Sequence, residues 1–188
     1  LSDSEGTLYC ETGLTEEQWS ALLELKNVQR GRISELAPRF GLEFRAGKTP
    51  WELACDIALP CATQNELDAE AASALLRNGC ICVAEGANMP STIEAAKAFE
   101  AAGVLYAPGK ASNAGGVATS GLEMSQNAMR LSWTQEEVDG RLQEIMQGIH
   151  DACVKYGRRD NGSISYVDGA NIAGFVKVAE AMLAQGVV

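Results

Sequence analysis

The sequence contains no apolar stretch that approaches the roughly 20 residues needed for a membrane-spanning helix, so no membrane partner is expected. Residues 1–5, LSDSE, have neither the basic start nor the apolar run of a secretory signal. A cytoplasmic location is therefore the expectation.

Positive charge is also scarce. The chain has 15 Lys and Arg residues against 25 Asp and Glu residues, a formal net charge of −10. A protein of this balance has no basic face on which to hold many phosphates, so nucleic acid is not an expected partner. The negative charge is instead typical of a surface that keeps a protein in solution.

Several catalytic and metal-binding signatures are missing. The single histidine, His150, falls inside a predicted helix, and we interpret it as a surface or packing residue. The six cysteines form no C-x-x-C pair, which indicates reduced, mostly buried thiols. No Asp/Glu/His cluster has metal-ligand spacing, and no G-x-S-x-G elbow or Cys/His pair supports nucleophilic catalysis. No metal is expected.

What is present is an alternation of helix and strand signals, in a chain of 188 residues that is 46% hydrophobic and 21% charged. Three short apolar runs, residues 54–59, 80–84 and 104–106, are predicted as buried strands. Residues 156–165 form the predicted flexible loop. Six helices are predicted. Capping boxes start two of them, at Thr15 with Gln18 and at Thr134 with Glu137. The others are residues 32–40, which Gly41 ends, a helix from Asp68 to Gly79, a helix that Ser91 and Glu94 cap and Gly103 ends, and residues 168–185.

This order predicts a parallel sheet with right-handed crossovers. The fold class is α/β: the C-terminal part of a Rossmann-like dinucleotide-binding domain, with about three parallel strands and helices, followed by C-terminal helices. Such domains usually have five or six strands, and residues 1–4 look like the end of a strand that begins earlier. The G-x-G-x-x-G turn that would precede such a strand by about 20 residues is absent, so we expect it outside this chain.

The first candidate site is Asp3 and Ser4, at the end of that strand. An acid here can accept hydrogen bonds from an adenosine ribose, whereas a 2′-phosphate calls for hydroxyls and cations. Ser4 supplies a hydroxyl, and Lys26 and Arg32 could supply the cations. A solvated turn with two surface cations is the alternative.

Two further candidates follow predicted strands, where parallel sheets bind ligands. Residues 60–66, PCATQNE, place four polar side chains in a row, more than a plain connection needs. Residues 85–90, EGANMP, contain Gly86 and Ala87, which allow a ligand to approach the backbone closely. Each loop could also be a simple connection.

The most informative segment is residues 108–123, PGKASNAGGVATSGLE. Its small residues surround Asn113, and Ser120 follows in a predicted helix. Small residues let two backbones and a ligand meet, and a hydroxyl at a helix start favours a carboxylate. A tight contact between helix and sheet would explain the glycines, but not Asn113 or Ser120.

Taken together, these motifs resemble the NADP-dependent branch of the hexameric glutamate dehydrogenases. The resemblance runs through the whole chain. It is carried by residues 60–67 (PCATQNEL), 84–90 (AEGANMP), 108–110 (PGK), 113–124 (NAGGVATSGLEM) and 169–175 (GANIAGF).

The resemblance implies roles for individual residues. Ser120 matches the serine that binds the substrate side-chain carboxylate, Val117 lines that pocket, and Asn113 lies near the nicotinamide and the substrate. The implied cofactor is NADP, and its binding residues are Asp3, Ser4, Lys26, Arg32, Ala62, Thr63, Gln64, Asn88 and Asn113. Asp3 leaves cofactor choice open, since an acid there would repel a phosphate unless the cations outweigh it.

The implied reaction is the reversible oxidative deamination of L-glutamate to 2-oxoglutarate and ammonia. The resemblance assigns no catalytic residue to this chain, because the lysine and aspartate that transfer protons belong to an N-terminal domain that is absent here. Residues 1–166 would belong to the NADP-binding domain, and residues 167–188 would form a helix that packs back on the absent domain. The full-length enzyme would be a homohexamer, and the fragment could self-associate.

Two other interpretations stay open. The first is a related amino-acid dehydrogenase for apolar substrates, which would lack the hydroxyls of Thr119 and Ser120. The second is a non-catalytic nucleotide-binding module.

Overall fold

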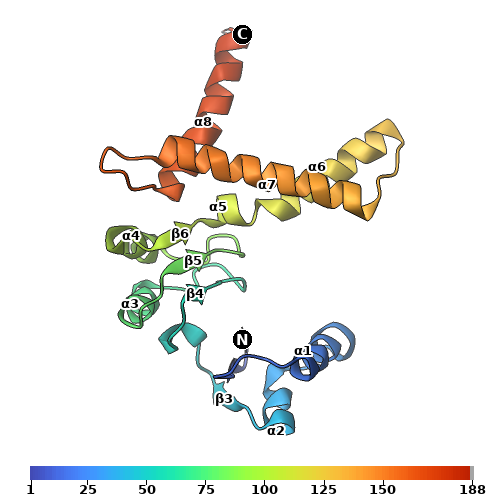
Figure 1. Ribbon diagram of the computed structural model, residues 1–188, viewed down its shortest axis with the longest axis vertical. Helices are drawn as coiled ribbons and strands as arrows, with labels where there is room; N and C mark the ends of the chain where they lie inside the picture. The colour runs from blue at the N-terminus through green and yellow to red at the C-terminus, as the bar shows by residue number, and fades with distance from the viewer. Residues whose placement is uncertain (187–188) are drawn as a thin grey trace. The chain divides into compact units, whose positions relative to one another are not determined.

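The computed structural model describes residues 1–186 and divides into two compact units, Leu1–Ala54 and Cys55–Val188. Figure 1 labels their elements. Each unit has its own three-stranded sheet.

The first unit is built on an antiparallel sheet in the order β1-β2-β3. Strand β1, Ser2–Asp3, pairs with β2, Gly6–Tyr9, which also pairs with β3, Glu43–Ala46. We predicted the end of a strand at residues 1–4 but not β2 or β3. Within the described residues β1 joins this antiparallel sheet and not the parallel one.

Helices pack against this sheet and bury a small apolar core around Leu8, Leu22 and Leu36. The predicted capping box at Thr15 and Gln18 is confirmed, and it starts helix α1. Helix α1, Glu16–Leu23, continues into a π-helical segment, Glu24–Gln29. A 3₁₀ turn, Ile33–Glu35, leads into α2, Leu36–Phe40. A second 3₁₀ turn, Pro50–Glu52, follows β3. Gly41 ends α2 in the left-handed conformation, as predicted.

The second unit contains the predicted parallel sheet, in the order β4-β5-β6. Its strands are β4, Ile57–Ala58, β5, Cys82–Ala84, and β6, Leu105–Ala107. β4 and β5 are shorter than the predicted runs 54–59 and 80–84, and β6 is shifted by one residue from 104–106. Helix α3, Ala69–Arg77, joins β4 to β5, and α4, Ile93–Ala102, joins β5 to β6. Both helices lie on the same side of the sheet (Figure 1), as right-handed crossovers in one direction require.

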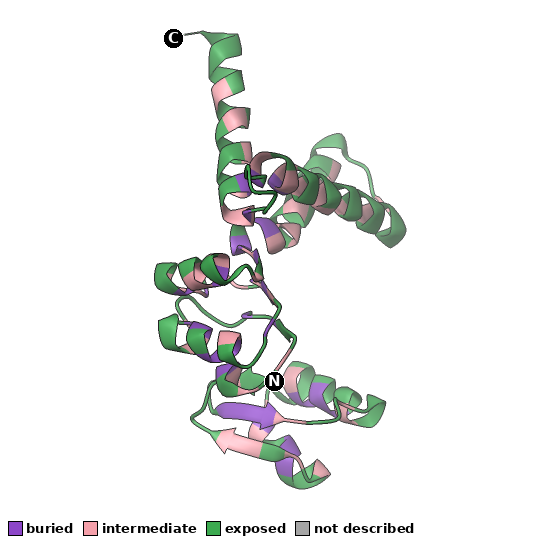
Figure 2. Cartoon of the chain, turned by 60° about the vertical axis from the view of Figure 1, so that its left-hand side comes forward, coloured by how far each residue is buried: buried purple, intermediate pink, exposed green. Residues whose placement is uncertain are grey.

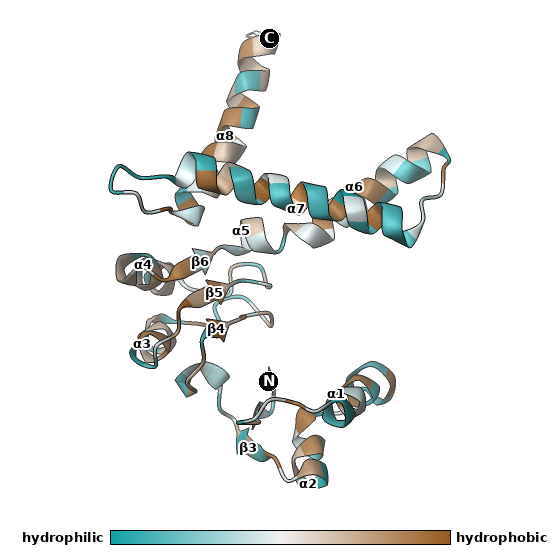
Figure 3. Cartoon of the chain, viewed as in Figure 1, coloured by the Kyte–Doolittle hydropathy of each residue, from teal (hydrophilic) through white to brown (hydrophobic). Residues whose placement is uncertain are grey.

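The two faces of this sheet differ. Ala58, Val83 and Tyr106 form one row across the strands and are buried, and the Tyr106 ring lies 5.6 Å from that of Phe99 on α4. The neighbouring row contains Ile57 and Leu105, which are 57% and 68% exposed. The strands are largely apolar (Figure 3), so within the described residues this second face keeps two large apolar side chains exposed.

Four helices follow β6: α5, Gly109–Ser112, α6, Ala114–Met129, α7, Gln135–Gly157, and α8, Tyr166–Gln185. Helices α7 and α8 meet where Gly157 faces Ser165 and Gly169 faces the Cys153 carbonyl. A Cβ at either glycine would overlap backbone, so only glycine permits this approach. Beyond that point α8 is largely exposed (Figure 2).

Three detailed predictions were wrong. The N-cap of α4 is Thr92 and not Ser91, because Ser91 is held in an extended bridge with Leu67 and the helix starts one residue later. Helix α8 begins at Tyr166, with Ser165 as its cap. The thiols are free but not mostly buried: Cys80 and Cys153 are buried, whereas Cys61 is exposed in the loop after β4.

Candidate functional site

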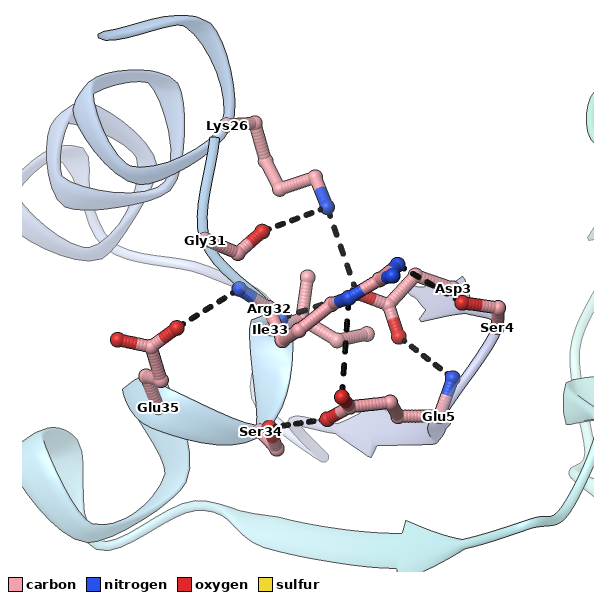
Figure 4. A network of polar contacts seen from close by, with 9 residues as sticks. All are labelled: Asp3, Ser4, Glu5, Lys26, Gly31, Arg32, Ile33, Ser34 and Glu35. Atoms are coloured by element: carbon pink, nitrogen blue, oxygen red, sulfur yellow. Dashed lines mark hydrogen bonds and ion pairs between the residues drawn. The ribbon is translucent and has the colours of Figure 1, made fainter. Parts of the chain in front are cut away.

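The first group of predicted site residues gathers at the start of the first unit (Figure 4). Asp3 Oδ1 accepts a hydrogen bond from the Glu5 N–H at 3.0 Å. Its Oδ2 accepts from the Ile33 N–H at 3.0 Å and from Lys26 Nζ at 3.4 Å. Both oxygens of Asp3 are thus engaged within the loop.

These bonds change the acidity of Asp3. Partial burial is the largest single influence and opposes ionisation. The hydrogen bonds from Ile33, Glu5 and Lys26 together outweigh it, so the pKa of Asp3 is lowered. Asp3 is therefore a carboxylate whose charge is stabilised by its neighbour Glu5 and by donors from two other segments, Lys26 and Ile33.

The two predicted cations also belong to this group. Arg32 Nη1 donates to Ser4 Oγ at 2.8 Å, and Arg32 Nε lies 3.6 Å from Glu5 Oε1. Lys26 Nζ also donates to the Gly31 carbonyl at 3.0 Å. The structure therefore brings Asp3, Ser4, Lys26 and Arg32 together, as expected. It adds Glu5, whose role as an ion-pair partner no sequence motif indicated.

The second group lies in the second unit, at the carboxyl ends of β4 and β5. A cavity of about 490 Å³ is lined by Cys61, Ala62, Thr63, Gln64, Gly86, Ala87 and Asn88. The predicted residues Ala62, Thr63, Gln64 and Asn88 therefore share one pocket.

Backbone hydrogen bonds join the two loops that form this pocket. The N–H groups of Gly86 and Ala87 both donate to the Pro60 carbonyl, at 3.0 and 3.1 Å. The Asn65 N–H donates to the Met89 carbonyl at 3.0 Å. The two loops thus form one continuous wall of the pocket.

Two side chains shape that wall. Glu66 Oε1 accepts from the Ala62 N–H at 2.8 Å and from the Thr63 N–H at 3.4 Å. A Cβ at Gly86 would lie 2.5 Å from Cys61 Sγ, so a side chain there would push the loops apart. We predicted that Gly86 permits close approach of a ligand, but the group that approaches it within this chain is Cys61.

Asn113 connects this pocket to the helices. Its Nδ2 donates to the Ala87 carbonyl at 3.1 Å and to Asn88 Oδ1 at 2.7 Å. Asn113 also occupies the position before α6. The residue predicted to serve both cofactor and substrate therefore joins the pocket to the start of α6.

Val117 and Ser120 lie one turn apart on α6 and are both exposed. Ser120 Oγ donates to the Gly116 carbonyl at 3.3 Å, and Thr119 Oγ1 donates to the Gly115 carbonyl at 2.9 Å. The prediction of a hydroxyl at a helix start was wrong, because Ser120 lies in the second turn and Asn113 occupies the start. Neither Val117 nor Ser120 lines the 490 Å³ pocket.

Two polar contacts near the pocket were missed. Lys110 Nζ donates to Asn171 Oδ1 at 2.7 Å and so connects α5 to α8. Glu85 is buried, with 4% of its surface exposed, and accepts from three donors. Both residues fall inside motifs that the sequence singled out, but their partners are distant along the chain.

Other parts of the chain offer less chemistry. Among residues 1–186, no group of three or more His, Cys, Asp or Glu side chains is arranged to hold a metal ion. His150 is exposed, and its Nδ1 lies 2.7 Å from the Tyr166 hydroxyl, so its interpretation as a surface or packing residue stays a prediction. No helix within the described part of the chain is long and apolar enough to cross a membrane.

Comparison with known proteins gives consistent similarities. The family model for Glutamate/Leucine/Phenylalanine/Valine dehydrogenase matches residues 1–186. The chain is 63% identical over 187 residues to the NADP-specific glutamate dehydrogenase of Salmonella typhi, and 53% identical over 189 residues to the NAD-specific glutamate dehydrogenase of Bacteroides fragilis. Each match covers 100% of this chain and 42% of the relative, so the chain spans less than half the length of either.

A solved structure agrees. The crystal structure of Plasmodium falciparum glutamate dehydrogenase superposes with a TM-score of 0.92 at 46% identity, over 100% of this chain and 40% of that one. The fold described above is therefore that of the matching part of a much longer chain.

Proposed function

The chain belongs to the Glutamate/Leucine/Phenylalanine/Valine dehydrogenase family, and from that premise we propose that it forms the cofactor-binding part of an NADP-dependent glutamate dehydrogenase. The proposed reaction is the reversible oxidative deamination of L-glutamate to 2-oxoglutarate and ammonia. One observation carries the proposal: Asn113 bonds to Asn88 at 2.7 Å and stands directly before the helix that bears Val117 and Ser120. A nicotinamide pocket and a substrate-binding helix would thus share one residue.

The residues present fit a dinucleotide with a 2′-phosphate. Ser4, Lys26 and Arg32 offer one hydroxyl and two cations in one place, and both oxygens of Asp3 are already engaged. Thr63, Gln64 and Asn88 offer polar groups at the carboxyl ends of parallel strands, where such folds bind the nicotinamide half. The nicotinamide ring would accept or donate the hydride, and the protein has to orient the ring and the substrate.

Substrate choice would rest on α6. Ser120 Oγ makes only a long bond of 3.3 Å to the Gly116 carbonyl, so its proton is available to a carboxylate. The Thr119 hydroxyl is held more closely, at 2.9 Å. A dehydrogenase for apolar amino acids is disfavoured, because an apolar substrate would offer the weakly held Ser120 hydroxyl no acceptor.

The chain's own residues bind and orient, and we assign none of them to proton transfer. By resemblance, a lysine and an aspartate elsewhere in the enzyme would do that work. We also propose a homohexameric, cytoplasmic enzyme, on the strength of the resemblance to the hexameric glutamate dehydrogenases.

The test is substrate discrimination in the complete enzyme. Ser120→Ala should lower kcat/KM for glutamate about 10- to 150-fold, the value of one hydrogen bond to a charged group. Norvaline, which lacks the side-chain carboxylate, should be almost unaffected. Ser125→Ala is the matched control, because Ser125 lies on the same helix and its hydroxyl makes the same kind of bond, to the Gly121 carbonyl at 2.9 Å. Equal losses for glutamate and norvaline, or an unmodified enzyme that does not reduce NADP⁺ with glutamate, would refute the proposal.

A further inference from the structure

Glu85 stands directly after β5, beneath the loops of the proposed nicotinamide pocket. Its Oε1 accepts a hydrogen bond from the Tyr106 hydroxyl at 2.6 Å and from the Ser91 N–H at 3.3 Å. Its Oε2 accepts from the Gly109 N–H at 2.6 Å. Both side-chain oxygens act only as acceptors, which is the geometry of a carboxylate.

No cation compensates this buried group. None of the ion pairs within residues 1–186 involves Glu85, and its three partners are a phenol and two backbone N–H groups. A buried carboxyl without a cation is costly unless several donors surround it. The three donors provide that compensation, and an apolar residue at this position would leave all three without this acceptor. The carboxylate is therefore suited to holding the elements that carry these donors in one arrangement.

The donors come from separate parts of the second unit. Tyr106 belongs to β6, Gly109 is the first residue of α5, and Ser91 follows the pocket loop. The backbone of Glu85 takes part as well, since its carbonyl accepts from Ser112 Oγ at 2.6 Å. Glu85 therefore connects the end of β5 to β6, to α5 and to the segment that follows the pocket loop.

Through Gly109, the hydrogen bonds of Glu85 connect to the residues of the proposed nicotinamide pocket. The Gly109 carbonyl accepts from the Asn113 N–H at 2.9 Å, and Asn113 Nδ2 donates to Asn88 Oδ1 at 2.7 Å. Gly109 also lies so close to the Ala87 carbonyl that an added Cβ would come within 2.6 Å of it. A shift of Gly109 would therefore move Asn113 and Asn88 relative to each other.

We propose that Glu85 is a positioning residue: its carboxylate fixes α5, and through Gly109 and Asn113 it sets the place of the nicotinamide pocket relative to the substrate helix α6. The inference rests on the proposed function. Tyr106 donates to the same carboxylate from β6, outside the link through Gly109 and Asn113. Burial, followed by its hydrogen bond to Glu85, raises the pKa of the Tyr106 phenol, so this donor keeps its proton throughout the neutral range.

Glu85→Gln is the decisive variant because it keeps the size and shape of the side chain but replaces one of its two acceptor oxygens by a donor. A glutamine has one acceptor oxygen, so its –NH₂ group must face the N–H of either Gly109 or Ser91. Tyr106→Phe is the matched control. It removes one donor and leaves the carboxylate bonded to both backbone N–H groups, and its ring can still pack on Phe99.

Both variants are made in the complete enzyme and assayed with glutamate and [2-²H]glutamate, together with the dissociation constant of 2′,5′-ADP. Glu85→Gln should lower kcat about 10- to 100-fold and raise the deuterium isotope effect on kcat, because misplaced reactants slow hydride transfer. The dissociation constant of 2′,5′-ADP, which probes only the adenosine end, should stay within about twofold of the unmodified enzyme. Tyr106→Phe should keep kcat within about threefold.

Other results would overturn the inference. If Glu85→Gln and Tyr106→Phe lower the melting temperature alike and leave kcat and the isotope effect unchanged, Glu85 serves stability only. If Glu85→Gln does not fold, Glu85→Asp replaces it, since the shorter side chain cannot reach all three donors; normal turnover of that variant would equally overturn the inference. An unmodified enzyme without glutamate activity would refute the proposed function and this inference with it, whereas an active one with unaffected variants refutes the inference alone.

Discussion

At the scale of single residues, the hydrogen bonds of Asp3 bear on the choice between NADP and NAD. An acid at this point of a dinucleotide fold usually accepts hydrogen bonds from the ribose, and it would oppose a 2′-phosphate. Here Asp3 is occupied by the N–H groups of Ile33 and Glu5 and by Lys26. Its charge is paired, so under the proposed function we expect the cations beside it to decide the preference.

We therefore predict that replacing both Lys26 and Arg32 by Ala in the complete enzyme lowers the preference for NADP over NAD by roughly 10²-fold or more. Each charge-assisted hydrogen bond to the phosphate contributes about 1.5–3 kcal/mol. The loss of Lys26 also exposes the 2′-phosphate to an unpaired Asp3. The measurement is the ratio of kcat/KM for the two cofactors.

Arg30→Ala, in the same loop, is the control for a general loss of positive charge. A double variant that keeps its cofactor ratio would mean that Lys26 and Arg32 are ordinary surface cations.

At the scale of the elements, the approach of α7 to α8 depends on Gly157 and Gly169, of which Gly169 lies within α8 itself. A Cβ at Gly169 would overlap the Cys153 carbonyl, whereas a Cβ at Gly148 on α7 would meet nothing within 4 Å. Gly169→Ala should therefore destabilise the protein by about 1–3 kcal/mol through overpacking. Gly148→Ala should be neutral or stabilising by up to about 1 kcal/mol.

Thermal unfolding of the two variants measures the difference. Equal melting temperatures would mean that α7 and α8 can separate without cost.

The sequence predicts an element well when the residues that define it are close together in the chain. The capping boxes at Thr15 and Thr134 are complete within four residues, and both are confirmed. The Ser91 cap failed because a distant residue, Leu67, holds Ser91 in an extended bridge. Strands β2 and β3 were missed because Gly6 pairs with Ala46 far along the chain, and four-residue strands show too little periodicity.

The site divides in the same way. The resemblance implied that Thr63 and Asn88 lie in the loops that hold the nicotinamide half of the cofactor, and the structure brings both residues, with Gln64, to one pocket. The role of Glu85 could not be predicted, because its partners Tyr106 and Gly109 lie more than 20 residues away.

At the scale of the whole molecule, α8 presents an apolar stripe that nothing covers within the described residues. Phe175, Val178 and Met182 recur at helical spacing and are 72%, 60% and 67% exposed. Such a stripe is typical of a helix that packs on another part of a protein. We predicted that residues 167–188 pack back on a further domain, and this stays a prediction.

Phe175→Asp tests it in the complete enzyme. If the stripe is covered there, the variant should lose about 3–5 kcal/mol of stability, from the lost aromatic packing and a carboxylate brought into an apolar contact. Lys177→Asp, on another face of α8, is the control and should change stability little. Equal shifts in melting temperature for both variants would mean that the stripe faces solvent.

The order of the parallel sheet bears on how the second unit folds. Strands β4, β5 and β6 neighbour one another in the order in which the chain supplies them, and each pairing joins residues about 25 positions apart. The entropy lost on closing a loop rises only with the logarithm of its length, so the two pairings have nearly the same cost. Each pairing closes only a short stretch of chain and needs no contact with distant residues. The mean sequence separation of contacting residues, the contact order, is therefore low for a parallel sheet. It can grow from β5 outward, and each strand that docks brings its own covering helix with it.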